Sequence, residues 1–306
     1  MIPSESPHLI VTASSHPGET GKNNEDAYSV THYRLDSGPR RSLLALVADG
    51  IGGHQAGEVA ARLAVDTVVQ RVAASNGRDP LPVLRTAVVE AGRAIQRAAA
   101  LSPDQEGMGS TVAVAWEIDG RLYTVSVGDS RIYFLRAGEL RRLTTDHTWV
   151  QKALDRGIIT PEEAQNHPHA HILRRHLGGA QEAQPDLRLR LAAEESDARA
   201  LANQGLHLRQ GDQILLCSDG LTDLVSDEEI RATISAQPPA VSVPTLIDLA
   251  RARGGHDNIT VVVVLIPAQP RRRRPALPTL LWASLLLVLL AAAGSVALLW
   301  FGLWPW

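Results

Sequence analysis

The sequence predicts an α+β fold in which antiparallel sheets are covered by helices. Two hairpin signals indicate antiparallel strands: Asp119-Gly120 lies between two strand-like runs, and Ala137-Gly138 repeats the pattern shortly afterwards. The strongest helical stretches occur as a consecutive pair beside these hairpins, without strict alternation of strand and helix. This order favours antiparallel sheets over a doubly wound parallel sheet.

The individual elements follow from local periodicity. Strands are expected where branched and aromatic residues cluster, and helices where apolar residues recur at three- and four-residue spacing. The expected strands are 43–48, 111–117, 122–127, 131–136, 213–218 and 259–266. The expected helices are 57–72, 81–100, 149–156, 161–166, 227–236 and 243–253.

The composition limits the possible classes of function. A chain of 306 residues with 44% hydrophobic content can bury a sizeable core. The net charge is −3 and includes the four arginines 271–274, so the rest of the chain carries −7. This acidic body argues against a nucleic-acid partner, which requires a basic face. Cys217 is the only cysteine, so neither an intramolecular disulfide nor a multi-thiolate metal site can form.

The C-terminal stretch 280–301 is expected to cross the cell membrane as a single helix. Residues 275–306 carry no charge, and about 22 largely apolar positions are enough to span a bilayer. A buried core helix is the alternative, but it fits poorly with so long an uncharged stretch. Arginines 271–274 favour a cytoplasmic location for residues 1–266. Residues 267–279 then form a Pro/Arg-rich tether that can also contact anionic lipid, and residues 302–306 form a short tail.

Acidic residues recur where apolar strands end and in nearby tight turns. An Asp-Gly pair after a strand is usually a plain turn. If these strands share one sandwich, however, their acids can meet at one edge, where mutual repulsion requires protons or cations. Oxygen donors without cysteine favour the hard cations Mg²⁺ and Mn²⁺. The acids concerned are Glu25, Asp26, Asp49, Asp129, Asp219 and Asp257.

Seven motifs together resemble the metal-dependent protein phosphatases of type 2C, the PPM family, in their bacterial form. They are NNEDA, VADGIGGHQAGEVAA, MGSTVAVAW, VGDSRIYFLRAGELRRLTTDHTWV, HILRRHLGG, GDQILLCSDGLTDLVSDEEI and GGHDNITVVVV. The motifs follow the family's order and cover about residues 9 to 266, so the set is highly specific. The resemblance implies a four-layer αββα sandwich, two antiparallel sheets flanked by helices with metals at one end, within a phosphatase domain of residues 1–266.

The resemblance also assigns two metal sites for Mn²⁺ or Mg²⁺. Asp49 is expected to bridge the two ions. Asp219 and Asp257 would complete the first site, while Glu25 and the carbonyl of Gly50 would complete the second. Catalysis would depend on these aspartates through the water that the two metals activate.

Two further acids and the reaction follow from the same resemblance. Asp26 matches an acid that holds metal-bound water, and Asp129 matches a ligand of a third, weaker metal. The implied reaction is hydrolysis of phosphoserine and phosphothreonine in proteins by a metal-bridged hydroxide. The catalytic domain is expected to be monomeric, and a membrane tether makes receptor serine/threonine kinases natural substrates.

The chain departs from the family pattern at the phosphate site. Gly21 occupies the position of an arginine that clamps the substrate phosphate, and Lys22 is the adjacent candidate for phosphate binding. Ile51 replaces a histidine of animal members, as is usual in bacterial members. The missing arginine raises an alternative function, a catalytically weak pseudophosphatase that regulates or binds phosphoproteins.

A histidine-rich segment allows two interpretations. His167, His169 and His171 alternate, so an extended strand would place three imidazoles on one side, where they could bind zinc. The simpler interpretation is a loop after the variable flap 149–167. His147 is expected to order the junction before this flap, and Asn258 to order the loop beside Asp257.

Overall fold

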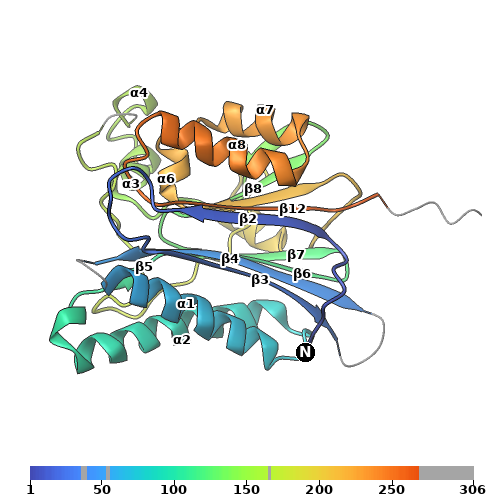
Figure 1. Cartoon of the computed structure of the whole chain (residues 1–306), viewed down its shortest axis with the longest axis horizontal. Helices are drawn as coiled ribbons and strands as arrows, with labels where there is room; N and C mark the ends of the chain where they lie inside the picture. The colour runs from blue at the N-terminus through green and yellow to red at the C-terminus, as the bar shows by residue number, and fades with distance from the viewer. Residues whose placement is uncertain (36–39, 53–55, 165–166, 269–306) are drawn as a thin grey trace, which may run out of the picture. The chain divides into compact units, whose positions relative to one another are not determined.

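Two antiparallel sheets form the centre of the unit Met1–Pro267 (Figure 1). The computed structural model describes residues 1–35, 40–52, 56–164 and 167–268. The first sheet has the order β1-β3-β4-β6-β7-β10 with β5 paired to β4, and the second has the order β2-β12-β11-β8-β9. The strands of the first sheet are β1 (Ile2–Pro3), β3 (Asp26–Arg34), β4 (Arg41–Ile51), β5 (Gly109–Ser110), β6 (Val112–Ile118), β7 (Arg121–Val127) and β10 (Leu206–His207). Those of the second are β2 (Ile10–His16), β8 (Arg131–Arg136), β9 (Glu139–Arg142), β11 (Gln213–Cys217) and β12 (Ile259–Leu265).

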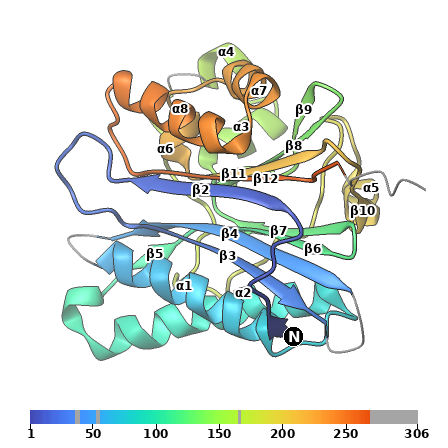
Figure 2. The same ribbon diagram turned by 45° about the vertical axis from the view of Figure 1, so that its right-hand side comes forward.

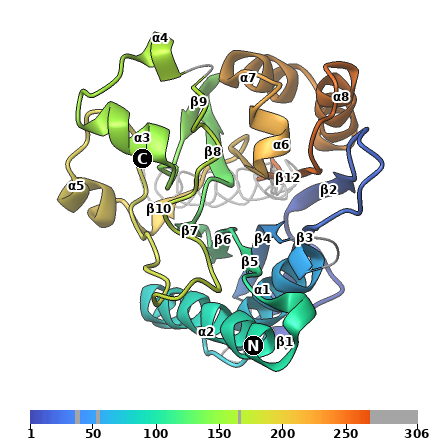
Figure 3. The ribbon, with the colours of Figure 1, turned by 90° about the vertical axis from the view of Figure 1, so that its left-hand side faces the viewer.

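Helices cover the outer face of each sheet and complete four layers (Figure 2). α1 (Ala56–Ala73) and α2 (Pro80–Leu101) pack on the first sheet, and α6 (Asp219–Thr222), α7 (Asp227–Ala236) and α8 (Pro239–Ala252) pack on the second. Figure 3 shows the shorter α3 (Trp149–Asp155), α4 (Pro161–Ala164) and α5 (Asp197–Ala202) on the side of β8 and β10. A 3-10 turn, η1 (Pro103–Gln105), follows α2. The structure therefore confirms two antiparallel sheets flanked by helices.

The central strand β4 shows why its sequence is hydrophobic without alternation. Leu44 and Leu46 pack with α1 and α2, whereas Leu43, Ala45 and Val47 face the second sheet. Both faces of β4 are thus buried, and the two-residue side-chain period places apolar residues on each. This layering fixes the position of Asp49 at the end of a rigid strand.

Both expected hairpins are confirmed. Ile118 pairs with Arg121 and Arg136 pairs with Glu139, so each loop contains two residues. Asp119 and Gly120 have φ values of 51° and 79°, and the second loop has the same left-handed pattern. Such turns match the right-handed twist of the flanking strands.

Several elements differ from the sequence-based expectation. β2 and β3 were not expected, since their polar residues mask the strand signal. β4 continues past Asp49 because its last residues, Gly50 and Ile51, pair with β5. Asp219 opens the short helix α6, where a simple turn was expected. α8 begins at Pro239, earlier than expected, because proline suits the first helical turn.

The predicted tether and membrane-spanning stretch could not be compared with the structure. Most of 267–279, all of 280–301 and the tail 302–306 lie outside the described residues. Within the described ranges, no helix combines the length and apolar character that a membrane crossing requires.

Candidate metal centre

The expected metal ligands converge at one end of the two sheets. All but Asp26 line a single cleft of about 1500 Å³. They come from five separate segments: the approach to β3, the end of β4, the β7–β8 turn, the start of α6 and the loop before β12. The residues lining the cleft include Glu25, Asp49, Gly50, Asp129, Asp219 and Asp257.

Asp26 does not line the cleft but lies directly opposite Asp49 in the β3–β4 ladder. The hydroxyls of Ser218 and Thr260 donate hydrogen bonds to its Oδ2, at 2.7 and 2.6 Å. Its Oδ1 is buried without a hydrogen-bond partner. Burial raises the pKa of Asp26 to about 8, although the two hydroxyls act in the opposite direction. Without a cation nearby, this carboxyl is therefore protonated at neutral pH.

The other acids of the cleft repel one another in the same way. Burial raises the pKa of Asp49 and of Asp129 well above the usual range, and repulsion from Asp219 raises both further. Burial raises the pKa of Asp219 to about 6, and the negative charges of Asp223 and Asp257 contribute to this rise. Lys22 is the only lysine or arginine among the described residues that line the cleft. The negative charge is thus not offset by the protein itself.

The donor set fits hard divalent cations. The cleft supplies carboxylate and carbonyl oxygens, the ligands that Mg²⁺ and Mn²⁺ prefer. Oδ1 of Asp26 and Oδ1 of Asp219 are both buried and lack hydrogen-bond partners. Buried carboxylate oxygens without partners are costly unless a cation is bound nearby.

Hydroxyl groups that the sequence analysis did not single out hold Asp49 in place. Its N–H donates to Oγ1 of Thr111 at 3.0 Å, and its carbonyl accepts from the Thr111 N–H at 2.8 Å. The Ser110 hydroxyl also donates to this carbonyl, at 3.0 Å. The sequence signal for these groups was the Ser110-Thr111 pair in the MGSTVAVAW motif. Ser218 and Thr260, which bond to Asp26, likewise lie within the motifs that contain Asp219 and Asp257.

Glycines let the segments of the cleft approach one another. A Cβ on Gly50 would lie 2.2 Å from the Gly57 carbonyl oxygen, and a Cβ on Gly57 would lie 2.7 Å from the Glu25 carboxylate. A Cβ on Gly220 would lie 2.1 Å from the carbonyl oxygen of Asn258. The glycines after Asp49 and Asp219 therefore permit close contact between segments, a requirement additional to the tight turns expected from the sequence.

Asn258 connects the N-terminal loop to the β12 end of the cleft. Its Oδ1 accepts a hydrogen bond from the Glu25 N–H at 2.7 Å. Its Nδ2 donates to the carbonyls of Pro17 and Asn23, at 3.0 and 3.2 Å. The expectation that Asn258 orders this loop is confirmed, and the ordered loop is the one that carries Glu25.

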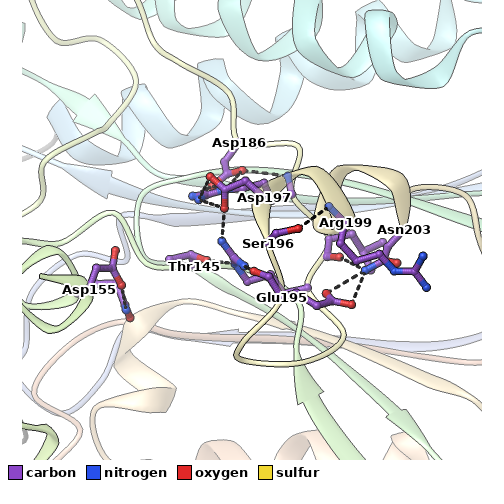
Figure 4. A network of polar contacts seen from close by, with 12 residues as sticks. Thr145, Asp155, Asp186, Glu195, Ser196, Asp197, Arg199 and Asn203 are labelled. Carbon is purple, nitrogen blue, oxygen red and sulfur yellow. Dashed lines mark hydrogen bonds and ion pairs between the residues drawn. The ribbon is translucent and has the colours of Figure 1, made fainter. Parts of the chain in front are cut away.

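His147 orders the junction before the flap, as expected. Its Nδ1 accepts from the Gly128 N–H at 3.0 Å, and its Nε2 lies 3.2 Å from Oδ2 of Asp186. Burial raises the pKa of Asp186, but hydrogen bonds from His147 and Arg188 outweigh it and hold the pKa well below the usual range. Arg188 also contacts Asp197, which belongs to the polar network of Figure 4. The turn that carries Asp129 is thereby fixed to the rest of the domain.

The three alternating histidines do not share one face. The chain turns at this point, with the Ala170 N–H donating to the His167 carbonyl at 2.9 Å. The His167 ring stacks on Trp149 with centroids 4.8 Å apart, and the His169 ring meets Trp149 edge-on. His171 lies instead beside Asp223. The loop interpretation therefore holds for His167 and His169, while His171 belongs to a different group.

Gly21 and Lys22 both line the mouth of the cleft. Gly21 has a φ of 72°, and a Cβ placed on it would meet no atom within 4 Å. Space therefore exists for a longer side chain, but the backbone conformation favours glycine. Lys22 is exposed, and its charge acts to lower the pKa of Glu25, so its ammonium group lies near this acid of the cleft.

Residues 15–244 match the family profile described as Protein phosphatase 2C. The serine/threonine protein phosphatase PstP of Mycobacterium tuberculosis (strain ATCC 25618 / H37Rv) is 42% identical over 255 residues. This alignment covers 83% of the chain but only 44% of PstP, so the chain spans less than half the length of this relative. Protein phosphatase PhpP of Streptococcus pneumoniae (strain ATCC BAA-255 / R6) is 35% identical over 258 residues, which cover 81% of the chain and 93% of PhpP.

Solved structures show the same architecture. The crystal structure of the M. tuberculosis phosphatase PstP/Ppp superposes with a TM-score of 0.72 at 40% identity, covering 85% of this chain and 99% of that one. The PstP catalytic domain in complex with two manganese ions has a TM-score of 0.69 at 38% identity, with the same coverage of both chains.

Proposed function

The chain belongs to the protein phosphatase 2C family, and from this premise we propose that it hydrolyses phosphoserine and phosphothreonine in proteins with Mn²⁺ or Mg²⁺ as cofactor. One observation carries the proposal: oxygen donors from five separate segments meet in one cleft with almost no protein cation beside them. All of these donors come from one chain, which supports a monomeric catalytic domain.

Each residue has a proposed role in this cleft. Asp49 would be shared by two cations, with Asp219 and Asp257 completing one site and Glu25 and the Gly50 carbonyl completing the other. Asp129, on which Asp219 exerts the strongest repulsion, would hold a third cation together with Asp219. When bound, such cations lower the pKa of a shared water and offset the negative charge of the phosphoryl oxygens.

The remaining groups position the substrate and the acids. Ser218 and Thr260 occupy Oδ2 of Asp26, so Oδ1 is the atom free to hold a proton or accept one from water. Lys22 at the cleft mouth would supply a point charge for the substrate phosphate in place of the bidentate arginine. A weaker hold on phosphate is the expected consequence.

The test compares hydrolysis of p-nitrophenyl phosphate and of a phosphothreonine peptide by the purified chain, with Mn²⁺ and with chelator. We expect Asp49→Asn and Asp219→Asn to lower kcat/KM at least about a hundredfold, since loss of even a ligand's supporting partner costs 10- to 100-fold. Asp248→Asn is the matched control, because Asp248 is exposed on α8 and pairs only with Arg251 among the described residues. Activity that survives chelation, or equal activity in all variants, contradicts the proposal. A chain that binds Mn²⁺ and hydrolyses neither substrate is the pseudophosphatase of the alternative hypothesis.

We further propose that residues 280–301 anchor the enzyme in the cell membrane with residues 1–266 in the cytoplasm. The support is the uncharged apolar stretch and the arginines 271–274 before it. An anchored enzyme would meet membrane receptor kinases at high effective concentration, so these are the proposed substrates. Alkaline carbonate extraction tests the anchor: the full chain should stay with membranes, and a chain truncated after residue 268 should be released. Release of both contradicts the anchor.

A further inference from the structure

A pocket of about 570 Å³ lies between α2 and the segment 175–188, and it shares no lining residue with the acidic cleft. Arg85 and Val89, about one helical turn apart, form its α2 wall, and Arg175 belongs to the opposite wall. The same segment also borders the cleft, because His176, the residue after Arg175, lines it. The pocket and the proposed active site are therefore neighbours along one stretch of chain.

The two walls of the pocket are held together by hydrogen bonds. Gln96 Nε2, on α2, donates to the carbonyl of Gly179. Arg93 Nη2, also on α2, donates to Oε1 of Glu182 at 2.5 Å. These contacts join α2 to the segment that passes beside it in Figure 3. The pocket is therefore formed in the absence of any ligand.

Every acid that lines the pocket is already paired with an arginine. Besides the bond between Glu182 and Arg93, the Asp186 carboxylate accepts from Arg188 Nε at 2.9 Å. Arg188 Nη1 donates to the neighbouring Asp197 at 3.0 Å, and Arg190 bonds to the same carboxylate (Figure 4). These acids are thus offset and do not neutralise any further cation in the pocket.

Two other arginines of the pocket have no such partner. Among the described residues, neither Arg85 nor Arg175 has a hydrogen bond or an ion pair, and both residues are exposed. The amide of Gln184, also exposed, lines the same pocket and adds an uncharged donor. Because the acids are already paired, the two guanidinium groups give the pocket a surplus of positive charge.

We propose that Arg85 and Arg175 form a binding site for a phosphate group, separate from the metal centre. A guanidinium group presents paired N–H donors that match the oxygens of phosphate. The pocket volume leaves room for more than a single phosphate group. Two sources share this chemistry: a free phosphate ion, and a second phosphorylated residue on a substrate whose first phosphate lies in the cleft.

The test titrates inorganic phosphate into the full chain by calorimetry in the presence of chelator. Without metal, the acids of the cleft repel phosphate, so the metal centre does not contribute to binding. We expect one phosphate per chain. Arg85→Ala and Arg175→Ala should each weaken its binding at least about tenfold, since each removes a charged donor. Circular dichroism should show that both variants fold, because neither side chain bonds to another described residue.

Arg97→Ala is the matched control, because Arg97 is also exposed on α2 but does not line the pocket. Its phosphate affinity should equal that of the unchanged chain. The proposal is overturned if the unchanged chain binds no phosphate in chelator, or if Arg97→Ala weakens binding as much as Arg85→Ala does. It is also overturned if Lys22→Ala alone removes binding, because the phosphate then binds at the cleft mouth.

A second measurement distinguishes the two sources of phosphate, and it rests on the proposed function. With Mn²⁺ present, KM is compared for peptides that carry one or two phosphothreonines at a series of spacings. If the pocket receives a second substrate phosphate, the best doubly phosphorylated peptide should have a KM at least about tenfold lower. Arg85→Ala should remove this advantage and leave the KM for p-nitrophenyl phosphate unchanged. Equal KM values assign the site to free phosphate. Phosphate binding in chelator needs no catalysis, so failure of this inference and failure of the proposed function give different results.

Discussion

Asp26 and Asp49 face each other across the β3–β4 ladder, and both carboxyl groups are buried. Two like charges directly opposite in an antiparallel pair destabilise a sheet. The surrounding residues nevertheless hold both carboxyl groups in this position. Ser218 and Thr260 donate hydrogen bonds to the carboxyl of Asp26, and Thr111 accepts one from the N–H of Asp49. Burying these two carboxyl groups close together lowers the stability of the metal-free fold, and the cation-binding cleft depends on this arrangement.

The first prediction concerns the stability of the metal-free protein as a function of pH. Burial raises the pKa of Asp26 from 3.8 to about 8 in the folded chain, so between these values the folded state holds more protons than the unfolded state. The free energy of unfolding should therefore fall as the pH rises from about 4 to about 8. Each unit of pKa difference is worth about 1.4 kcal/mol, so thermal unfolding in chelator should reveal the trend clearly.

Asp26→Asn serves as the test variant for this trend, because an amide oxygen can still accept from Ser218 and Thr260 but does not titrate. Its unfolding temperature should depend less on pH across the same interval. Added Mn²⁺ should raise the unfolding temperature of the unchanged chain most at the upper end of the interval. A metal-free protein that becomes more stable between pH 4 and 8 contradicts the assigned cause.

The second prediction concerns the missing arginine. Gly21→Arg places a guanidinium at the cleft mouth, where a Cβ meets no atom within 4 Å. We expect a lower KM for a phosphothreonine peptide with little change in kcat, because a bidentate fork binds phosphate better than a point charge. The positive φ of Gly21 should cost about 1 kcal/mol of stability. Steady-state kinetics and denaturant unfolding measure the two effects separately.

Gly211→Arg is the control for strain and charge. Gly211 has a φ of 85° and no atom within 4 Å of an added Cβ, but it does not line the cleft. It should lose similar stability with an unchanged KM. If both variants lower KM alike, net charge explains the gain, and if Gly21→Arg leaves KM unchanged, the phosphate does not bind at this position.

The sequence predicted most of the central strands and all the long helices because their apolar residues carry a clear period. It also predicted the hairpins, since Asp119-Gly120 and Ala137-Gly138 suit the left-handed turns found there. β3 was missed because a strand that carries Asp26, Ser29 and His32 has little apolar signal. Its place in the sheet depends on pairing with β4, which no local pattern reports.

The order of the motifs predicted that the acids converge, but it did not predict which residues form hydrogen bonds to them. Hydroxyls such as Thr111 and Ser218 look ordinary in sequence, and their role depends on which segments lie beside them. For the three alternating histidines, the sequence pattern suggested an arrangement that the structure does not have. Their alternation suggested one face, whereas the turn at Ala170 separates His171 from His167 and His169. Periodicity places side chains only where the backbone conformation is known.

The third prediction separates positioning of Glu25 from general stability. Asn258→Ala removes the bonds to the Glu25 N–H and to the carbonyls of Pro17 and Asn23, and should cost about 1–3 kcal/mol of stability. Because the released loop carries Glu25, Mn²⁺ affinity measured by calorimetry should fall at least about tenfold.

Asn203→Ala is the matched control for this prediction. Asn203 Nδ2 donates to the Leu189 carbonyl and to the Glu195 carboxylate in the network of Figure 4, and Asn203 does not line the cleft. It should lose comparable stability and keep its Mn²⁺ affinity. Equal losses of affinity in the two variants would mean that Asn258 acts only through the fold, and that Glu25 needs no fixed loop to bind the cation.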